Sequence, residues 1–157
     1  MNRTKRKIFE ASMKLFAEKG YDSTSVEEIT ATVGVAKGTL YYHFSSKEEI
    51  FNFLVGEGMK LLQNSIEIKT STKPNSIEKL KAVILIELKV LKKYENIISI
   101  ILSQIWGSEP RHKVCKELVG QYIEVVKGIV KEGMERGEII DGDPDIVASR
   151  NFCYYLF

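Results

Sequence analysis

The feature that most constrains this chain is a pair of helix-start signals on either side of one short polar stretch. Ser25 and Glu28 have the S-x-x-E spacing of a capping box, in which each side chain bonds the other residue's backbone N–H group. Ser46 and Glu49 repeat that spacing. One helix is therefore predicted to begin at Val26, and another at Lys47, directly after Ser46.

Between the two boxes, the sequence predicts a tight turn and a second short helix. Gly34 can adopt the left-handed conformation that ends a helix. The following helix is expected over residues 36–44, where Leu40 and Phe44 are four apart and therefore point together into the core. Two short helices joined by a glycine-containing turn form the helix-turn-helix arrangement.

The free face of this second helix carries side chains suited to a DNA major groove. Such side chains donate hydrogen bonds, stack, or contact thymine methyl groups, and Gly38 would let the backbone come close to the duplex. The spacing alone also fits a capped helical hairpin with a solvated polar face. The predicted DNA contacts are Thr24, Ser25, Ala36, Lys37, Gly38, Thr39, Tyr41, Tyr42, His43 and Lys47; of these, Lys37, Thr39, Tyr42 and His43 would face bases, and Ser25, Tyr41 and Lys47 would hold phosphates.

The run GVAKGTLYYHF over residues 34–44, followed by SKEEI over 46–50, is similar to the DNA-binding signature of the tetracycline-repressor (TetR/AcrR) family. The upstream helix, Ile8 to Lys19 and ending in AEKGY over 17–21, resembles the first helix of that family. The resemblance covers about the first fifty residues. It implies an all-helical, ligand-responsive transcriptional repressor whose carboxyl-terminal helices pair with those of a second subunit.

The charge distribution agrees with a DNA-binding amino-terminal part. Residues 1–47 hold eight Lys and Arg against five Asp and Glu, a net charge of +3, whereas residues 48–157 hold fifteen against sixteen, a net charge of −1. The basic excess lies where phosphate binding requires it. At the chain start, Arg3, Lys5, Arg6 and Lys7 are expected to form either a basic arm that reaches phosphates or a minor groove, or a frayed, solvated terminus.

Other classes of protein find little support in the sequence. No apolar run is long enough to span a bilayer, and no apolar core follows the basic start as in a signal peptide. Two cysteines, Cys115 and Cys153, are too few for a disulfide framework and indicate buried thiols in a cytoplasmic protein. His112 and Cys115 lack the second ligand pair of a zinc site. We therefore expect no metal, no cofactor and no enzymatic activity.

The rest of the chain is predicted to be helical. The predicted fold class is all-α: a three-helix DNA-binding domain with a helix-turn-helix over residues 1–47, and a helical ligand-binding and dimerisation domain over residues 48–157. The last helix ends on an apolar, aromatic run, so we expect a truncated chain that lacks the second dimerisation helix. Helices are expected at about 47–68, 77–94, 96–106 (apolar nearly all round and therefore buried on most sides), 111–136 and from 144 onward, with a linker at 70–76.

The resemblance implies a pocket in the carboxyl-terminal domain. Because few polar groups are available there, an apolar, lipid-like or aromatic ligand is favoured. The expected function is that of a homodimeric repressor that binds a palindromic operator in double-stranded DNA and is released by a small-molecule effector. The alternative is a helical small-molecule-binding or interaction protein that no longer reads a specific DNA site. Candidate pocket residues, each also explained by ordinary core packing, are Leu62, Ile66, Leu88, Ile101, Ile105, Trp106, Tyr122 and Val126.

Overall fold

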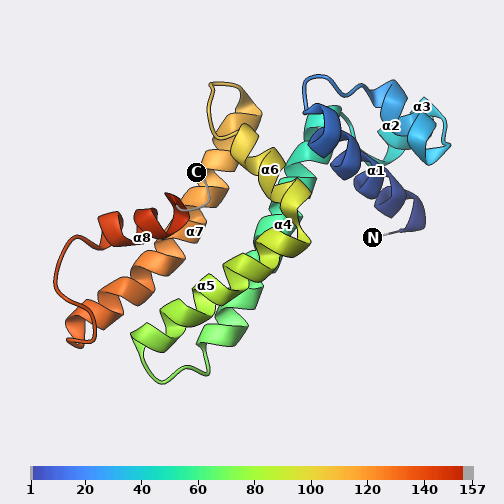
Figure 1. The fold of residues 1–157 in the computed structure, drawn as a ribbon. Helices are drawn as coiled ribbons and strands as arrows, with labels where there is room; N and C mark the ends of the chain where they lie inside the picture. The colour runs from blue at the N-terminus through green and yellow to red at the C-terminus, as the bar shows by residue number, and fades with distance from the viewer. Residues whose placement is uncertain (1, 154–157) are drawn as a thin grey trace. The chain divides into compact units, whose positions relative to one another are not determined.

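The computed structural model describes residues 2–153, apart from the side chains of residues 96, 97 and 151–153, and over this range the secondary structure is entirely helical. The predicted all-α class is therefore confirmed. Each described helix is too short or too polar to cross a bilayer. The helices, labelled in Figure 1, are α1 (Arg3–Lys19), α2 (Val26–Val33), α3 (Lys37–His43), α4 (Lys47–Thr70), α5 (Ser76–Lys93), α6 (Glu95–Ser103), α7 (Pro110–Glu135) and α8 (Pro144–Cys153).

The chain divides into two compact units. The amino-terminal unit contains residues 2–58 and 94–115, and the second unit contains residues 59–93 and 116–153. The structural division differs from the predicted functional boundary at residue 47, because α6 and the start of α7 belong with the amino-terminal helices. That functional boundary remains a prediction.

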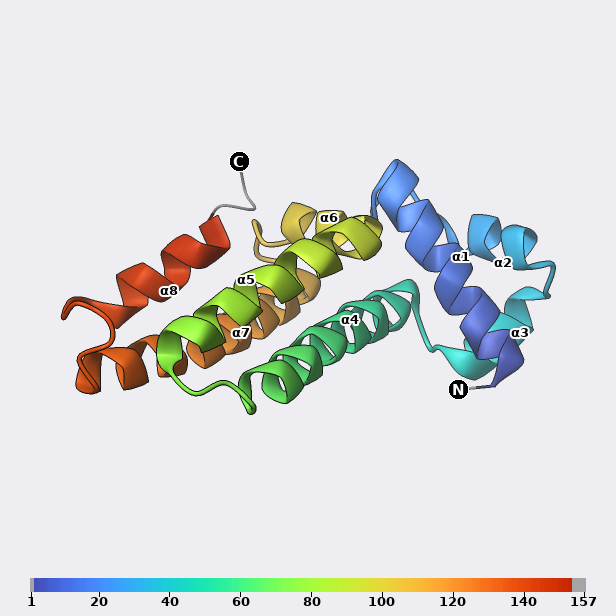
Figure 2. The ribbon, with the colours of Figure 1, turned by 60° about the horizontal axis from the view of Figure 1, so that its bottom comes forward.

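The core of the amino-terminal unit explains why three short helices hold together. Helix α1 contacts α2, α3 and α6, and Figure 2 shows α2 and α3 on the same side of α1. Ile8 from α1, Ile29 from α2 and Leu40 from α3 are completely buried. Full burial of one such side chain stabilises a fold by roughly 1.5–3 kcal/mol relative to exposure. The three helices thus share a single core, to which each contributes one fully buried apolar side chain.

The structure excludes one of the two predictions made for the basic residues at the start of the chain. Helix α1 begins at Arg3, capped by Asn2, whose side chain accepts the backbone N–H of Lys5 at 2.8 Å. The basic residues therefore lie in the first turns of the helix, and the predicted frayed terminus is wrong for the described residues. Their reach to phosphates or a minor groove remains a prediction. The Lys5 ammonium lies 4.7 Å from the ring centroids of both Phe44 and Phe53, which is close enough for a cation–π interaction.

Helix α6 is shorter and less enclosed than its apolar sequence predicts. It ends at Ser103, because the N–H of Gln104 donates to Ile101 in a tight three-residue turn. Ile100 and Ile101 are buried, but Trp106 lies beyond the helix and is 75% exposed. The expectation of a helix through Trp106, buried on most sides, is therefore wrong. Ile97 belongs to the same apolar run, and its side chain lies outside those that the structure describes.

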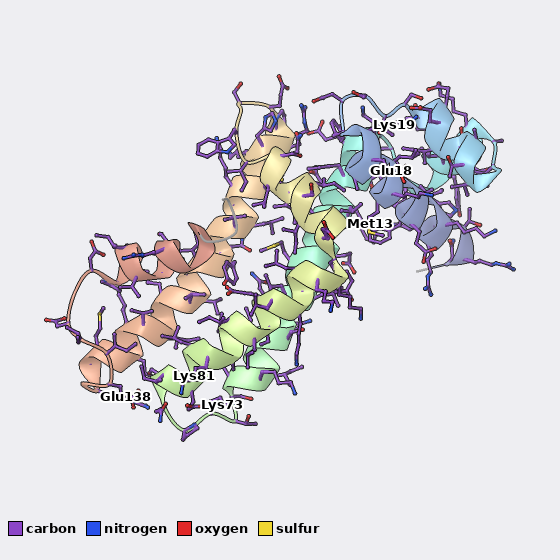
Figure 3. The ribbon with its side chains drawn as sticks, in the orientation of Figure 1. Met13, Glu18, Lys19, Lys73, Lys81 and Glu138 are labelled. Carbon is purple, nitrogen blue, oxygen red and sulfur yellow. The ribbon has the colours of Figure 1, made fainter. Side chains whose placement is uncertain are left out.

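In the second unit, the start of α5 is tied to the end of α7. Lys79 pairs with Glu132 at 2.6 Å, and the backbone N–H of Ser76 donates to the Glu138 carboxylate at 2.7 Å. Figure 3 shows Glu138 at the same end of this unit as Lys73 and Lys81.

Close approach at this junction requires a glycine at position 133. A Cβ atom there would lie 2.5 Å from the Ile139 side chain and 2.9 Å from the Ser76 Cβ. Both distances are far shorter than normal carbon–carbon contacts.

Two further predictions concern the carboxyl-terminal part of the chain. Cys115 is a buried free thiol, and burial raises its pKa to about 11. The Cys153 side chain and the predicted apolar run of the last helix, Phe152 together with residues 154–157, lie outside the described side chains.

Candidate nucleic-acid interface

The first capping box forms as the sequence predicts and fixes the start of α2. The Ser25 hydroxyl accepts the N–H of Glu28 at 3.1 Å, and the Glu28 carboxylate accepts the N–H of Ser25 at 2.9 Å. Lys19, labelled at the end of α1 in Figure 3, adds an ion pair to the same carboxylate at 2.6 Å. This bond from Lys19, followed by the bond from the Ser25 backbone, lowers the pKa of Glu28 to about 2.

The loop before α2 is held from inside the protein. The Thr24 side chain is 1% exposed, and its hydroxyl donates to the carbonyl oxygen of Gly20 at 2.8 Å. A phosphate contact through this hydroxyl, predicted from sequence, is therefore corrected: the group is enclosed and already bonded. Ser25 remains half-buried at the helix start, where N–H groups suit an anion.

Lys47 lies at the start of α4, where the sequence places it, but its ammonium group turns toward the same loop. Nζ donates to the carbonyl oxygens of Tyr21 at 2.8 Å and Thr24 at 2.9 Å, and lies 4.2 Å from the Tyr21 ring centroid. Burial lowers the pKa of Lys47. Lys47 thus has a structural role that its spacing did not indicate, and its phosphate contact remains a prediction.

The turn into the reader helix α3 has the expected geometry. Gly34 has φ 74° and ψ 40°, in the left-handed region, and its N–H donates to the Thr30 carbonyl at 2.9 Å. Ala36 is the residue before the helix and caps it without a side-chain bond. A Cβ atom at Gly38 would meet nothing within 4 Å, so the backbone there faces open space.

Burial divides α3 into an anchored face and a free face. Leu40 and Phe44 are buried at 0% and 1% exposure, as their spacing predicts, whereas Tyr41 and Tyr42 are 45% and 84% exposed. A tyrosine this exposed contributes little to packing, so α3 is fixed in the fold by one face and presents the other to solvent. Lys37 is exposed, and Thr39 and His43 are half-buried beside them.

An acidic residue that sequence reasoning did not single out contacts the reader helix. Glu27, in the first turn of α2, pairs with Lys37 at 2.5 Å, and this bond lowers the pKa of the carboxyl. The Lys37 ammonium also lies 6.0 Å from the Tyr41 ring centroid. No spacing rule connects positions ten apart across a turn, so only the packing of α2 against α3 reveals this pair.

The second capping signal forms with one difference. The Ser46 hydroxyl accepts the N–H of Glu49 at 3.0 Å, as predicted. The Glu49 carboxylate, however, bonds the N–H and hydroxyl of Ser45, both at 2.6 Å. Helix α4 therefore begins where the spacing indicates, with the reciprocal bond displaced by one residue.

The predicted ligand-binding residues do not share one environment. Ile66, Tyr122 and Val126 are buried in the second unit, whereas Ile101 is buried in the amino-terminal unit. Leu62 and Ile105 are half-buried. Leu88 and Trp106 are 54% and 75% exposed. The expectation that these last two side chains line an enclosed pocket is therefore wrong for the described part of the chain.

Comparisons with known proteins agree with this interface. The family model described as "Bacterial regulatory proteins, tetR family" matches residues 8–53, which include α2, α3 and most of α1. The fatty acid metabolism regulator protein of Bacillus subtilis is 33% identical over 137 residues, covering 86% of this chain and 70% of that protein. The biofilm operon icaADBC HTH-type negative transcriptional regulator IcaR of Staphylococcus epidermidis is 47% identical over 47 residues, covering 30% of this chain and 25% of that protein.

A solved structure supports the same assignment over nearly the whole chain. The crystal structure of the transcriptional regulator FadR from Bacillus subtilis in complex with stearoyl-CoA has a TM-score of 0.83 and 30% sequence identity. The match covers 94% of this chain and 80% of that one.

Proposed function

We propose that this chain, which belongs to the tetR family of bacterial regulatory proteins, represses transcription from a palindromic operator and releases that operator when a fatty acyl-CoA binds. The chain is a DNA-binding transcriptional regulator and not an enzyme. As further parts of the proposal, the protein binds its operator as a homodimer, its effector is an acyl-CoA, and it is located in the cytoplasm together with the operator DNA.

The observation that carries the proposal is the division of α3 into an anchored and a free face. Tyr42 is 84% exposed, while Leu40 on the opposite side is completely buried. A reader helix needs both properties, because its side chains must reach base edges while its axis stays fixed. Within the proposal, Lys37, Thr39, Tyr42 and His43 contact bases, and Ser25, Tyr41 and Lys47 contact phosphates.

Two subunits would present two reader helices to successive major grooves, about 34–36 Å apart or somewhat more. The effector would act through its different affinities for the DNA-binding and released conformations, since a ligand shifts an equilibrium only by that difference. Similarity to a regulator crystallised with stearoyl-CoA supports an acyl-CoA as effector. The buried apolar side chains of Ile66, Tyr122 and Val126 in the second unit suit an acyl chain.

DNase footprinting on the DNA upstream of the protein's own gene, with random DNA as competitor, tests the proposal. We expect a protected near-palindrome that survives the competitor and disappears when stearoyl-CoA is added. Tyr42→Ala should abolish the preference for this site over random DNA. Ile140→Ala, at a side chain that is 92% exposed in the second unit, is the matched control and should bind as the unmodified chain does.

Absence of a preferred site would contradict the repressor function and favour a helical small-molecule-binding protein instead. Protection that is unaffected by stearoyl-CoA would contradict the effector class alone.

A further inference from the structure

Arg111, the second residue of α7, reaches across the amino-terminal unit to the loop between α1 and α2. Its Nη2 atom donates to the Asp22 carboxylate at 3.0 Å, and its Nε atom donates to the Gln104 side chain at 2.8 Å. The Arg111 side chain is only 15% exposed, although its partner Asp22 is 73% exposed. Because hydrogen bonds from a charged donor are the stronger ones, Arg111 joins the end of α6 to this loop.

The same guanidinium group packs on the ring that organises the loop. Its central carbon lies 4.7 Å from the Tyr21 ring centroid. Tyr21 is 8% exposed and packs against the rings of Phe16 at 5.3 Å and Phe51 at 5.1 Å. The Tyr21 ring is therefore held in place by the aromatic core of the unit. The Arg111 guanidinium packs on this ring from a helix far along the chain from the helix-turn-helix.

Lys47 completes a continuous set of contacts that ends at the start of α2. Its ammonium lies over the Tyr21 ring and donates to the carbonyls of Tyr21 and Thr24. Thr24 immediately precedes Ser25, the N-cap of α2. We therefore infer that Arg111 influences the start of α2 indirectly, through its contacts with Tyr21 and Asp22 and through the contacts of Lys47.

Asp22 has a second effect in this arrangement, because two cations share one ring. Burial is the main cause of the lowered pKa of Lys47; the charge of Asp22 raises this pKa, and the charge of Arg111 lowers it further. Removing Arg111 would therefore leave the attraction between Asp22 and Lys47 unopposed. We expect this attraction to draw the ammonium away from the loop carbonyls and toward the Asp22 carboxylate.

From this geometry we propose that Arg111 is a positioning residue for operator recognition: it touches no DNA, but it sets the position of the α2 start and so the fit of the helix-turn-helix to the operator. The proposal rests on the DNA-binding function proposed above. It assigns a role in operator recognition to a residue far outside residues 8–53, which the family model matches.

Arg111→Met removes the guanidinium and keeps an apolar stem of similar reach. Amide hydrogen exchange in the absence of DNA is the first measurement. We expect the amides bonded in the Ser25–Glu28 capping box to exchange about tenfold faster, in keeping with the loss of charge-assisted bonds. The Gly34 amide, bonded at the other end of α2, should exchange at its original rate.

Operator affinity is the second measurement. Arg111→Met should weaken binding to the footprinted site by about tenfold, with much less effect on random DNA. Arg136→Met, directly after the end of the same helix at an exposed side chain paired with Glu132 at 2.8 Å, is the matched control and should alter neither readout. Asp22→Asn should have a smaller effect that does not add to that of Arg111→Met.

Three results would overturn the proposal. Unchanged exchange at the capping box, or equal acceleration throughout the unit, would reduce Arg111 to a general stabilising role. Local acceleration with unchanged operator affinity would separate the loop from DNA recognition. If the unmodified chain binds no operator, the proposed function fails, and the exchange measurement alone still decides whether Arg111 positions α2.

Discussion

Replacing Lys47 by methionine separates a structural role from a phosphate contact at one position. The ammonium donates to two carbonyl oxygens at 2.8 and 2.9 Å, those of Tyr21 and Thr24. Methionine keeps the apolar stem and removes both bonds. Each bond from a charged donor contributes about 1.5–3 kcal/mol. Burial of the charge, which lowers the pKa of Lys47, offsets part of that gain.

We therefore expect Lys47→Met to lower the free energy of unfolding by about 2 kcal/mol. For a chain of this size, that change corresponds to a fall in Tm of roughly 4–8 °C. Urea denaturation followed by circular dichroism measures the free energy. A salt series on random DNA measures the phosphate contribution, because the loss of one phosphate contact changes the slope of log K against log salt by about one unit.

Lys14→Met is the matched control, since the Lys14 side chain is 68% exposed and pairs only loosely with Glu18 at 3.9 Å. It should change stability by less than about 0.5 kcal/mol. If Lys47→Met leaves stability unchanged and reduces the salt slope by one unit, the structural argument is refuted and the sequence-based phosphate contact is correct. A fall in stability with an unchanged slope would favour the structural role alone.

Three further outcomes follow from the contacts described above. Gly133→Ala should destabilise the protein by about 1–3 kcal/mol through overpacking, whereas Gly128→Ala on the same helix, where a Cβ meets nothing within 4 Å, should be neutral or stabilising in urea denaturation. Glu28→Gln should be less stable than the unmodified chain above pH 4.5, because the pKa of Glu28 is lower in the folded state than in the unfolded state. The difference in stability should vanish as the pH falls from 4.5 to about 2, since protonation of the carboxylate removes the bond from Lys19. Glu27→Gln should tighten binding to random DNA in a competition assay, because it removes the carboxylate that pairs with the reader-helix lysine; weaker or equal binding would show that this pair does not compete with phosphate.

The sequence was most informative where structure is local. Capping spacings three residues apart and a glycine with positive φ depend on bonds within one turn of helix, so the starts of α2 and α4 and the end of α2 were predictable. The buried face of α3 was predictable for the same reason, since Leu40 and Phe44 are neighbours on any helix. The remaining side chains of α3 then lie on or beside the opposite, exposed face of the helix.

The predictions that failed, or that the structure supplemented with a role not foreseen, concern residues whose environment depends on other elements. Thr24 and Lys47 occupy positions where hydroxyl and ammonium groups suit a phosphate, but the loop folds so that both groups bond carbonyl oxygens inside the unit. Trp106 follows an apolar run and is nevertheless 75% exposed, because the tight turn at Gln104 ends the helix before it.

By itself, the sequence determined the helical class, the helix-turn-helix and its exposed face, because periodicity and capping act over a few residues of continuous chain. The tertiary structure alone decided which charges meet. Glu27 and Lys37 come together across a turn, and Arg111 reaches Asp22 and Tyr21 from a distant helix. Electrostatic and aromatic contacts between different elements have no sequence period, so they exist only once packing has placed their partners within a few ångströms.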